Sequence, residues 1–344
     1  MKIFTFIKEA ALYTFMKPLF PVFLILISGC ESSTNSPPPP PDRDLKSVEI
    51  ADIELTAESF DLNQGLVPEG YENSGRITVK VKKADGTIET IANPIMNQFA
   101  FTAKHLTVST QADHTLTLFS DENSFDYRNE KFELGVSIEG NTFPEKTFTF
   151  GIYWAGLKSL SFSGLSEAKG HDLLIHTAHI KDTNGDYRAY HVNDLTSEKR
   201  KLVVVPATQS LTFYADGGTG NPGLSGKNGT SYGSCDENGQ GYAGGNGENG
   251  GNGGDGGDAG NVIVKYVTPS DLNHIAVSTI GGSGGLGGPG GNGGSGCWSG
   301  FDGKIGYSGS NGKSTQTVYQ KVPASDVLLI FSDGHDFMGV QFIE

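Results

Sequence analysis

Cys235 and Cys297 are the two residues whose type and spacing point most directly to covalent chemistry. Each lies near the middle of a glycine-rich segment, at a similar distance from the residue where that segment begins. If both segments rise as extended legs that advance about 3.1 Å per residue, the two thiols reach the same height. A disulfide tolerates a Cα separation of only about 4.4 to 6.8 Å, which bundled legs meet by construction. We therefore predict a disulfide between them; the rival interpretation, a metal pair, lacks further ligands at suitable spacing.

Aromatic residues gather near the same two positions. Rigid, partly exposed rings on a polar apex suit stacking against sugar faces or anchoring a protein partner. The alternative is that the rings pack upon one another and cap the apex. The candidate ligand-binding residues are Tyr232, Tyr242, Trp298, Phe301 and Tyr307.

A group of histidines raises the question of a metal site. The group consists of His171, His176, His179 and His191. On a strand, however, His176 and His179 point to opposite faces, because side chains alternate along it. We therefore expect surface or hairpin histidines rather than metal ligands.

Residues 182–186 begin like a calcium-binding loop, with acidic or amide side chains at alternate positions. Tyr187 replaces the turn glycine of such a loop, and no glutamate follows at its closing position. An Asn184-Gly185 hairpin turn explains the segment more simply. The sequence therefore predicts neither a bound metal nor a cofactor.

Charge and motifs narrow the function further. The formal net charge of -14 and the lack of a Lys/Arg cluster argue against a nucleic-acid partner, which requires a basic surface. No Ser/His/Asp or paired-carboxylate constellation can be selected among so many acidic residues, and no GxxxxGK[ST] phosphate loop is present. We expect a protein that is not an enzyme, with a polysaccharide-acting hydrolase as the weakest of three alternatives.

The elements that must position the cysteines and rings are two glycine-rich excursions, residues 217–260 and 281–312. Glycine recurs at every third position on both sides of each cysteine, so each excursion has two legs and a tip. This is the period of the polyproline II conformation, and legs of polyglycine helices can hydrogen-bond to one another in place of a hydrophobic core. A flexible linker gives no reason for the period. A collagen requires more proline at the other positions, and a calcium-binding nonapeptide repeat requires an apolar residue where Gly260 stands.

The remaining sequence predicts a mostly β protein. Short alternating runs between residues 46 and 155 favour an antiparallel sandwich that resembles an immunoglobulin-like module. Residues 156–344 form a second β-domain, in which apolar runs stand before and after each glycine excursion. We expect both excursions to leave from and return to the same sheet, and we expect the apolar run 327–333, VLLIFSD, to be a further strand.

The first residues carry a targeting signal. An apolar run at 18–27 is too short to span a bilayer and suits the core of a signal peptide. It ends in Ile27-Ser28-Gly29-Cys30, which resembles the lipobox of bacterial lipoproteins. The resemblance implies that residues 1–29 are removed and that Cys30 carries a membrane-anchoring lipid.

Three further expectations follow from the same region. A complete signal begins at Met16, so residues 1–15 are a candidate upstream extension. Residues 30–45 contain five consecutive prolines and form a semi-rigid linker behind the lipid anchor. Glu31, rather than Asp, follows the cysteine, which by analogy with enteric lipoproteins implies the outer membrane.

The order GGDGGDAGNVIVKYV followed by a second glycine-rich excursion resembles the N-terminal glycine-rich domain of the Obg GTPases. Phage tail-tip adhesins are similar in using polyglycine bundles. The resemblance implies construction rather than GTPase activity. Our leading hypothesis is a lipid-anchored envelope protein that presents the bundle to a glycan or an envelope protein, for adhesion or recognition. A periplasm-facing assembly lipoprotein, in which the bundle is a spacer, is the second alternative.

Overall fold

The computed structural model describes residues 44–111, 114–332 and 340–343. The expected signal peptide (1–29), the candidate start at Met16, the lipid-bearing Cys30 and the linker up to residue 43 lie outside the described residues. Within them the chain is mostly β, as predicted.

The first domain contains strands β1 to β8 and two short 3-10 helices. Their bounds are β1 (Glu49–Ala57), β2 (Glu72–Lys82), β3 (Ile88–Ile91), β4 (Phe99–Lys104), β5 (Leu106–Thr110), β6 (Thr115–Ser120), β7 (Phe132–Ile138) and β8 (Lys146–Phe150), with η1 (Leu45–Ser47) and η2 (Met96–Gln98). The second domain has η3 (Trp154–Gly156), β9 (Ser159–Ser161), β10 (Leu173–Lys181), β11 (Asp186–Asp194), β12 (Lys199–Pro206), β13 (Leu211–Tyr214), β14 (Val262–Tyr266), η4 (Pro269–His274), β15 (Ile275–Ser278), β16 (Val318–Lys321), α1 (Ala324–Phe331) and β17 (Gln341–Ile343).

Two antiparallel sheets make up the first domain. One has the order β1-β2-β6-β5, with β3 added to β2, and the other has the order β4-β7-β8. Alternation along β2 sends Ile77, Val79 and Val81 inward, where they share one apolar core with Leu134 and Val136 of β7. The two sheets therefore pack as a β-sandwich, with polar residues on the outside.

The second domain also has two sheets, which carry the glycine excursions. The order of the larger is β12-β11-β10-β14-β16, with β17 pairing with β10, and that of the smaller is β15-β13-β9. Val203, Val264 and Phe213 belong to the apolar core between them.

The run expected as a strand at 327–333 is instead helical, and that prediction was wrong. Helix α1 follows Pro323, and its fully buried residues are Val327 and Phe331, one helical turn apart. A short apolar run fits a strand or a buried helix equally well, and here the i, i+4 spacing of these two side chains on one face decides between them.

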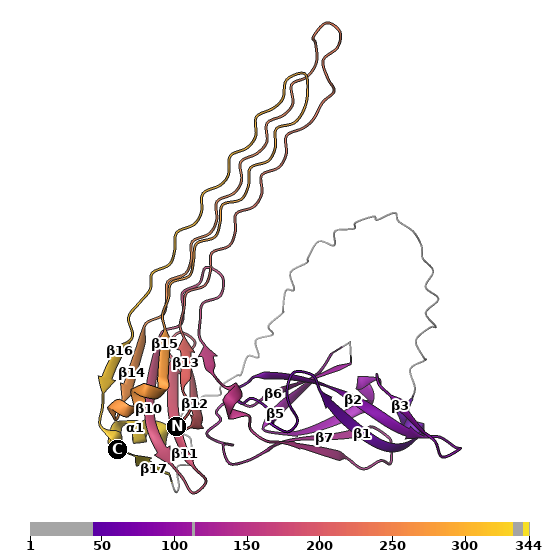
Figure 1. The fold of residues 1–344 in the computed structure, drawn as a ribbon, viewed down its shortest axis with the longest axis vertical. Coiled ribbons are helices and arrows are strands. Elements are labelled where there is room, and N and C mark those ends of the chain that lie inside the picture. The colour runs from indigo at the N-terminus through magenta and orange to yellow at the C-terminus, as the bar shows by residue number, and fades with distance from the viewer. Residues whose placement is uncertain (1–43, 112–113, 333–339, 344) are drawn as a thin grey trace, which may run out of the picture. The chain divides into compact units, whose positions relative to one another are not determined.

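The excursions do not leave from and return to one sheet, which corrects a second prediction. Residues 217–260 leave after β13 and return into β14, while residues 281–312 leave after β15 and return towards β16. The outgoing strands β13 and β15 pair in parallel in the smaller sheet, and the returning strands β14 and β16 pair in parallel in the larger one. Parallel neighbouring strands run in the same direction. Both excursions therefore begin at the same edge of the smaller sheet and end at the same edge of the larger sheet (Figure 1).

We name the four extended segments leg A (217–235), leg B (241–260), leg C (281–296) and leg D (298–315), and together the glycine bundle. They are joined by backbone hydrogen bonds that recur at every third residue. Gly223 of leg A donates to Leu286 of leg C, and Gly226 donates to Pro289. Leg C donates to leg B in the same way, and leg B donates to leg A. Leg D accepts from leg B and donates to leg C.

Glycine content decides which legs are central. Legs B and C carry glycine at two of three positions over most of their length and each contacts three other legs, whereas legs A and D carry it at one position and contact two. A Cβ atom at Gly288 of leg C would overlap the carbonyl oxygen of Leu224, and one at Gly287 would overlap that of Gly306. Each set of glycines spaced three residues apart along a leg therefore marks a line where that leg's backbone lies close to the backbone of a neighbouring leg.

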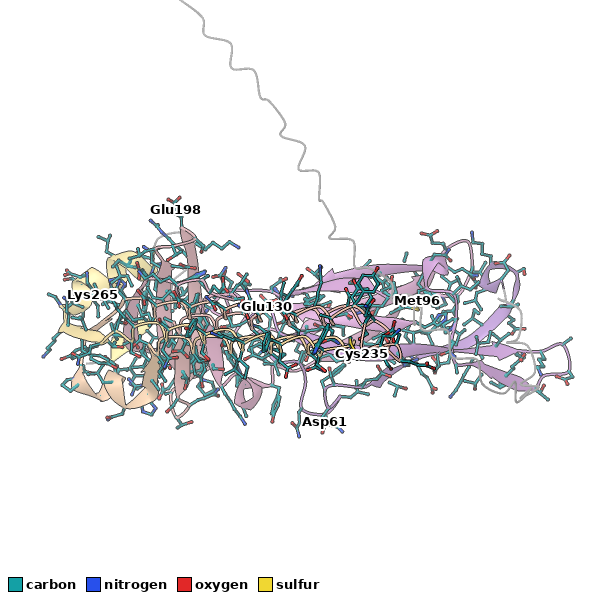
Figure 2. The ribbon with its side chains drawn as sticks, turned by 90° about the horizontal axis from the view of Figure 1, so that it is seen from above. Asp61, Met96, Glu130, Glu198, Cys235 and Lys265 are labelled. Carbon is teal, nitrogen blue, oxygen red and sulfur yellow. A yellow bond between two sulfur atoms is a disulfide. The ribbon has the colours of Figure 1, made fainter. Side chains whose placement is uncertain are left out.

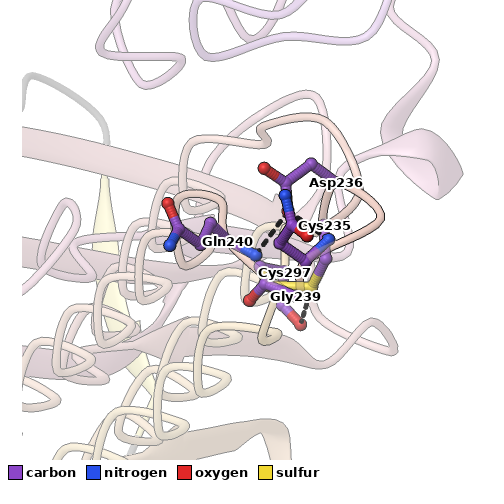
Figure 3. Close-up of a disulfide and its surroundings, with 6 residues drawn as sticks. Cys235, Asp236, Gly239, Gln240 and Cys297 are labelled. Carbon is purple, nitrogen blue, oxygen red and sulfur yellow. Dashed lines mark hydrogen bonds between the residues drawn. A yellow bond between two sulfur atoms is a disulfide. The ribbon is translucent and has the colours of Figure 1, made fainter.

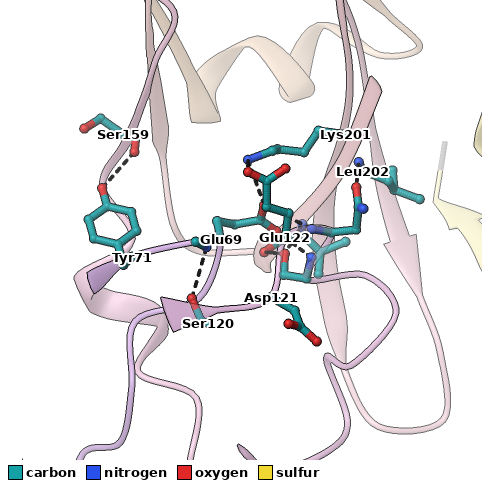
Figure 4. Close-up of polar contacts among 12 residues, drawn as sticks. Glu69, Tyr71, Ser120, Asp121, Glu122, Ser159, Lys201 and Leu202 are labelled. Atoms are coloured by element: carbon teal, nitrogen blue, oxygen red, sulfur yellow. Dashed lines mark hydrogen bonds and ion pairs between the residues drawn. The ribbon is translucent and has the colours of Figure 1, made fainter. Parts of the chain in front are cut away.

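Loop 121–125 of the first domain is hydrogen-bonded along β12 of the second. Val204 donates its amide to Ser124 Oγ at 2.9 Å, and Leu202 donates to Asn123 Oδ1 at 2.9 Å. Beside them the buried Glu69 accepts from the amide of Ser124, and Lys201 Nζ lies 3.7 Å away (Figure 4). Burial raises the pKa of Glu69. These contacts cover the edge strand β12, whose free backbone groups would otherwise be exposed.

Gly288→Ala is expected to destabilise the bundle by about 1–3 kcal/mol, because its methyl group has to push legs A and C apart. The matched control is Leu286→Ala, two residues away, where a side chain that is 74% exposed is shortened. It should change the free energy of unfolding by less than about 0.5 kcal/mol. Urea unfolding followed by tyrosine and tryptophan fluorescence measures both, and a larger loss in the leucine variant would contradict the packing described here.

Candidate functional site

The tip of the bundle is closed by a disulfide. Cys235, labelled in Figure 2, ends leg A, and Cys297 lies where leg C turns into leg D. The structure joins them as a disulfide with a Cα separation of 4.5 Å. Beyond Cys235 the chain turns tightly: Asp236 donates its amide to the carbonyl of Gln240, and its carboxylate accepts from the Gln240 amide at 2.7 Å (Figure 3). The disulfide therefore links the two excursions to each other at their far ends.

The five predicted aromatic residues do not form one cluster. Tyr232 and Tyr242 stand beside the disulfide with their ring centroids 5.5 Å apart. Trp298 also lies close to the disulfide, because it directly follows Cys297 in the chain. Gly244 of leg B donates its amide to the Trp298 carbonyl. Phe301 and Tyr307 follow along leg D, so Tyr307 belongs to the leg rather than to the tip.

The two groups of rings differ in their surroundings. The tyrosine pair matches the capping alternative, in which rings pack upon one another. Trp298, Phe301 and Tyr307 are 64%, 78% and 80% exposed, and none of them has a ring partner among the described residues. These three rings are available for contact with another molecule.

A row of amide and carboxylate side chains on leg B holds leg D in place, and sequence reasoning missed it. Each oxygen of the row accepts a backbone N–H of leg D, for example Asn246 Oδ1 from Phe301 at 2.9 Å and Asn252 Oδ1 from Tyr307 at 2.9 Å. The row consists of Asn246, Asn249, Asn252, Asp255 and Asp258. We call it the amide ladder. The available signal was the recurrence of Asn or Asp at every third position from 246 to 258.

His176 of β10 and His191 of β11 are buried, which corrects the expectation of surface or hairpin positions, whereas His179 of β10 and His171 are only partly buried. His176 and His191 are cross-strand partners with ring centroids 6.1 Å apart, and they are 3% and 9% exposed. They line a cavity of about 630 Å³ together with Arg200 of β12 and residues of α1. The sheet face carrying these histidines is covered by a helix that the sequence did not predict.

Burial sets the protonation of His176. It lowers the pKa of this imidazole to about 4, and the nearby Lys265 adds to the effect. Its Nδ1 has no hydrogen-bond partner among the described residues. His176 is therefore neutral at physiological pH.

His171, Asp194 and Ser197 form the one hydrogen-bonded combination of a histidine, an acid and a hydroxyl that the described residues show. His171 Nδ1 lies 2.7 Å from Asp194 Oδ2, and Ser197 Oγ donates to the same carboxylate at 2.5 Å. In a catalytic triad the serine donates to the histidine instead. The second carboxylate oxygen accepts the amides of Thr196 and Ser197, so Asp194 organises the turn between β11 and β12.

Neither a metal cluster nor a membrane-spanning helix occurs in the part of the chain that the structure describes. No group of three or more His, Cys, Asp or Glu there could hold a metal ion. Within the same ranges no helix is both long enough and apolar enough to cross a bilayer. In comparisons with known proteins, no family model, curated protein or solved structure matches the chain.

Replacing Cys235 and Cys297 by serine should loosen the tip and leave the sheets intact. The disulfide closes a loop with a sequence separation of 62, which the chain-entropy model equates with about 4 kcal/mol. Amide exchange should accelerate at residues 232–245 and 294–300 and stay unchanged in β10–β12. Cys30→Ser is the matched control and should preserve the bond in nonreducing peptide mapping. Two free thiols in the wild-type chain would refute the linked tip.

His176 predicts a loss of stability in mild acid. Its folded pKa of about 4 lies below the ordinary histidine value of 6.5, so between these two pH values the unfolded chain binds a proton that the folded chain does not. Stability from this group is complete above about pH 6.5 and falls by about 3 kcal/mol as the pH drops to 4. His176→Gln should lose less stability than the wild type across this window when urea unfolding is measured at each pH. Parallel profiles for the two proteins would show that His176 is not the source.

Proposed function

We propose that this protein is a lipid-anchored component of a bacterial cell envelope that presents the glycine bundle for surface adhesion or recognition. It acts without catalysis. The observation that carries the proposal is the construction of the bundle: a disulfide-closed tip and exposed aromatic rings are held on legs whose backbones are hydrogen-bonded to one another.

The finer description of the fold is part of this proposal. The legs are polyglycine II helices, which the three-residue period of their hydrogen bonds supports. The sandwich in front of them is immunoglobulin-like, which its two antiparallel sheets support. Both are rigid modules, and rigidity lowers the entropy cost of binding at the tip.

Anchoring rests on the sequence. A lipid on Cys30 and the five prolines behind it would tether the folded part to the outer membrane through a short spacer. The exposed rings favour adhesion over the spacer alternative, because a passive spacer has no need of exposed Trp298 and Phe301 side chains.

Two observations bear on the hydrolase alternative. The cavity beside His176 offers room for a small ligand, and His171 is hydrogen-bonded to a carboxylate. Neither brings a nucleophile into contact with a base, which acyl or glycosyl transfer requires. Adhesion is therefore the function that the geometry favours.

The proposal is tested on cells that carry the full chain. Three versions are compared: the wild type, Cys30→Ala, and a variant in which residues 219–256 and 284–311 are each replaced by a short Gly-Ser connection. We expect the wild type to be cut by protease added to intact cells and to promote attachment to abiotic surfaces or to other cells. Cys30→Ala should leave the detergent phase, because the lipid is lost. The bundle-less variant should stay anchored and lose attachment.

Two outcomes would contradict it. Cleavage only after the envelope is opened would favour the periplasm-facing spacer. Attachment that persists in the bundle-less variant would remove the bundle from the function.

A further inference from the structure

We propose that one side of the bundle binds an extended polysaccharide chain lying along legs B and D. This side, the aromatic face, consists of Trp298, Phe301 and Tyr307 of leg D together with Asn246, Asn249 and Asn252 of the amide ladder. The inference rests on the proposed function and narrows it to one ligand class and one set of residues.

The three rings occupy one line of leg D. The carbonyls of Trp298, Phe301 and Tyr307 accept from Gly244, Gly247 and Gly253 of leg B. Residues separated by multiples of three on such a leg hold equivalent positions, and their side chains project the same way. At about 3.1 Å per residue, Phe301 stands about 9 Å from Trp298 along the leg and about 19 Å from Tyr307.

The backbone amide and the backbone carbonyl of two of the ring residues are both hydrogen-bonded to leg B. Phe301 and Tyr307 donate their amides to Asn246 and Asn252, and their carbonyls accept from glycine amides of leg B. Such rings are presented in place, with only side-chain rotation left to restrict on binding. Contact with a flat apolar surface therefore costs little entropy.

The amide ladder supplies donors beside the rings. Each partner on leg D is a backbone N–H, so the end of each asparagine facing leg D has to be its oxygen. The Nδ2 groups of Asn246, Asn249 and Asn252 donate to no described residue. Three amide donors at about 9 Å spacing thus run parallel to the line of rings.

This combination fits a sugar chain better than a protein surface. The rings are separated by backbone and by Lys304, so they form no contiguous apolar patch of the kind that a protein interface buries at its centre. A pyranose presents a small apolar face bordered by hydroxyl groups. The apolar face stacks on an aromatic ring, and the hydroxyl oxygens accept hydrogen bonds from amide donors. An extended polysaccharide repeats that unit in a line, as the aromatic face repeats rings and amides.

The other sides of the same legs differ in chemistry. Ile305 belongs to the row of leg D whose neighbours Asp302 and Asn311 accept amides of leg C. Leu286 of leg C and Ile305 are as exposed as the rings, yet both are aliphatic. The aromatic residues of leg D are thus confined to the line beside the amide ladder, and Ile305 provides a control on the same leg.

Binding is measured on the purified full chain in detergent with its disulfide intact. The chain has two tryptophans, so Trp154→Phe leaves Trp298 as the sole tryptophan, whose emission is excited selectively over that of the tyrosines. The probes are cellohexaose and chitohexaose, which are neutral, and an acidic oligogalacturonate, which would in addition pair with Lys304. We expect a saturable change in Trp298 emission with at least one probe. Phe301→Ala and Tyr307→Ala should each weaken the binding by roughly tenfold.

Two matched variants separate binding from folding. Asn252→Asp keeps the oxygen that holds leg D, as Asp255 and Asp258 already do in the same ladder, but removes the outward amide donor. It should weaken probe binding severalfold while leaving the urea midpoint unchanged. Ile305→Ala should change neither quantity.

The outcomes distinguish this site from the wider proposal. No saturable change with any of the three probes overturns the polysaccharide assignment, and binding unaffected by Phe301→Ala and Tyr307→Ala overturns the aromatic face. If cells nevertheless attach through the bundle, only the ligand class is wrong. If the probes bind at this face but attachment does not need the bundle, the site stands and the proposed function falls.

Discussion

The backbone hydrogen bond between neighbouring legs is the interaction on which the rest of the structure depends. The legs have no apolar core, and their stability comes from amides and carbonyls that meet at every third residue. Each such bond contributes about 0.5–1.5 kcal/mol net, so many in register are needed. Close backbone approach in turn requires glycine, because a Cβ at positions such as Gly285 would collide with a neighbouring carbonyl. The composition of the excursions thus follows from how they are held together.

Register is established in the sheets and carried to the tip. β14 and β16 pair Ile263 with Val318, an offset of 55, and the amide ladder joins Asn246 to Phe301 with the same offset of 55. β13 and β15 pair Leu211 with Ile275, and the same spacing recurs between Asn228 and Asn292. Because both offsets persist, the leg lengths match and Cys235 meets Cys297. An insertion in one leg alone would shift its hydrogen-bonding groups, its cysteine and its aromatic residues out of register with the neighbouring legs.

Sequence reasoning reached the parts of the fold that depend on local pattern. The period of three predicted legs and tips, matching leg lengths predicted which cysteines would meet, and alternation predicted the sandwich. It failed where the structure of a segment depends on contacts with residues far away in the sequence. The sheet that receives each excursion is set by pairing across many residues, and the burial of His176 depends on helix α1, whose apolar run fits either secondary structure. The three-residue recurrence that includes Asn252 is visible in the sequence. Its role as an acceptor for the backbone of leg D follows only from the position of leg D beside leg B.

Amide hydrogen exchange resolved by residue across 217–315 tests the central claim most directly. In leg B the amides of Gly250 and Gly251 both donate to neighbouring legs, while that of Asn252 donates to no described residue; in leg A only Gly223 of the triplet 223–225 donates. The account predicts protection with a period of three, at two amides per triplet in leg B and one in leg A. Fast exchange at all of these glycines, or protection without the period, would contradict it.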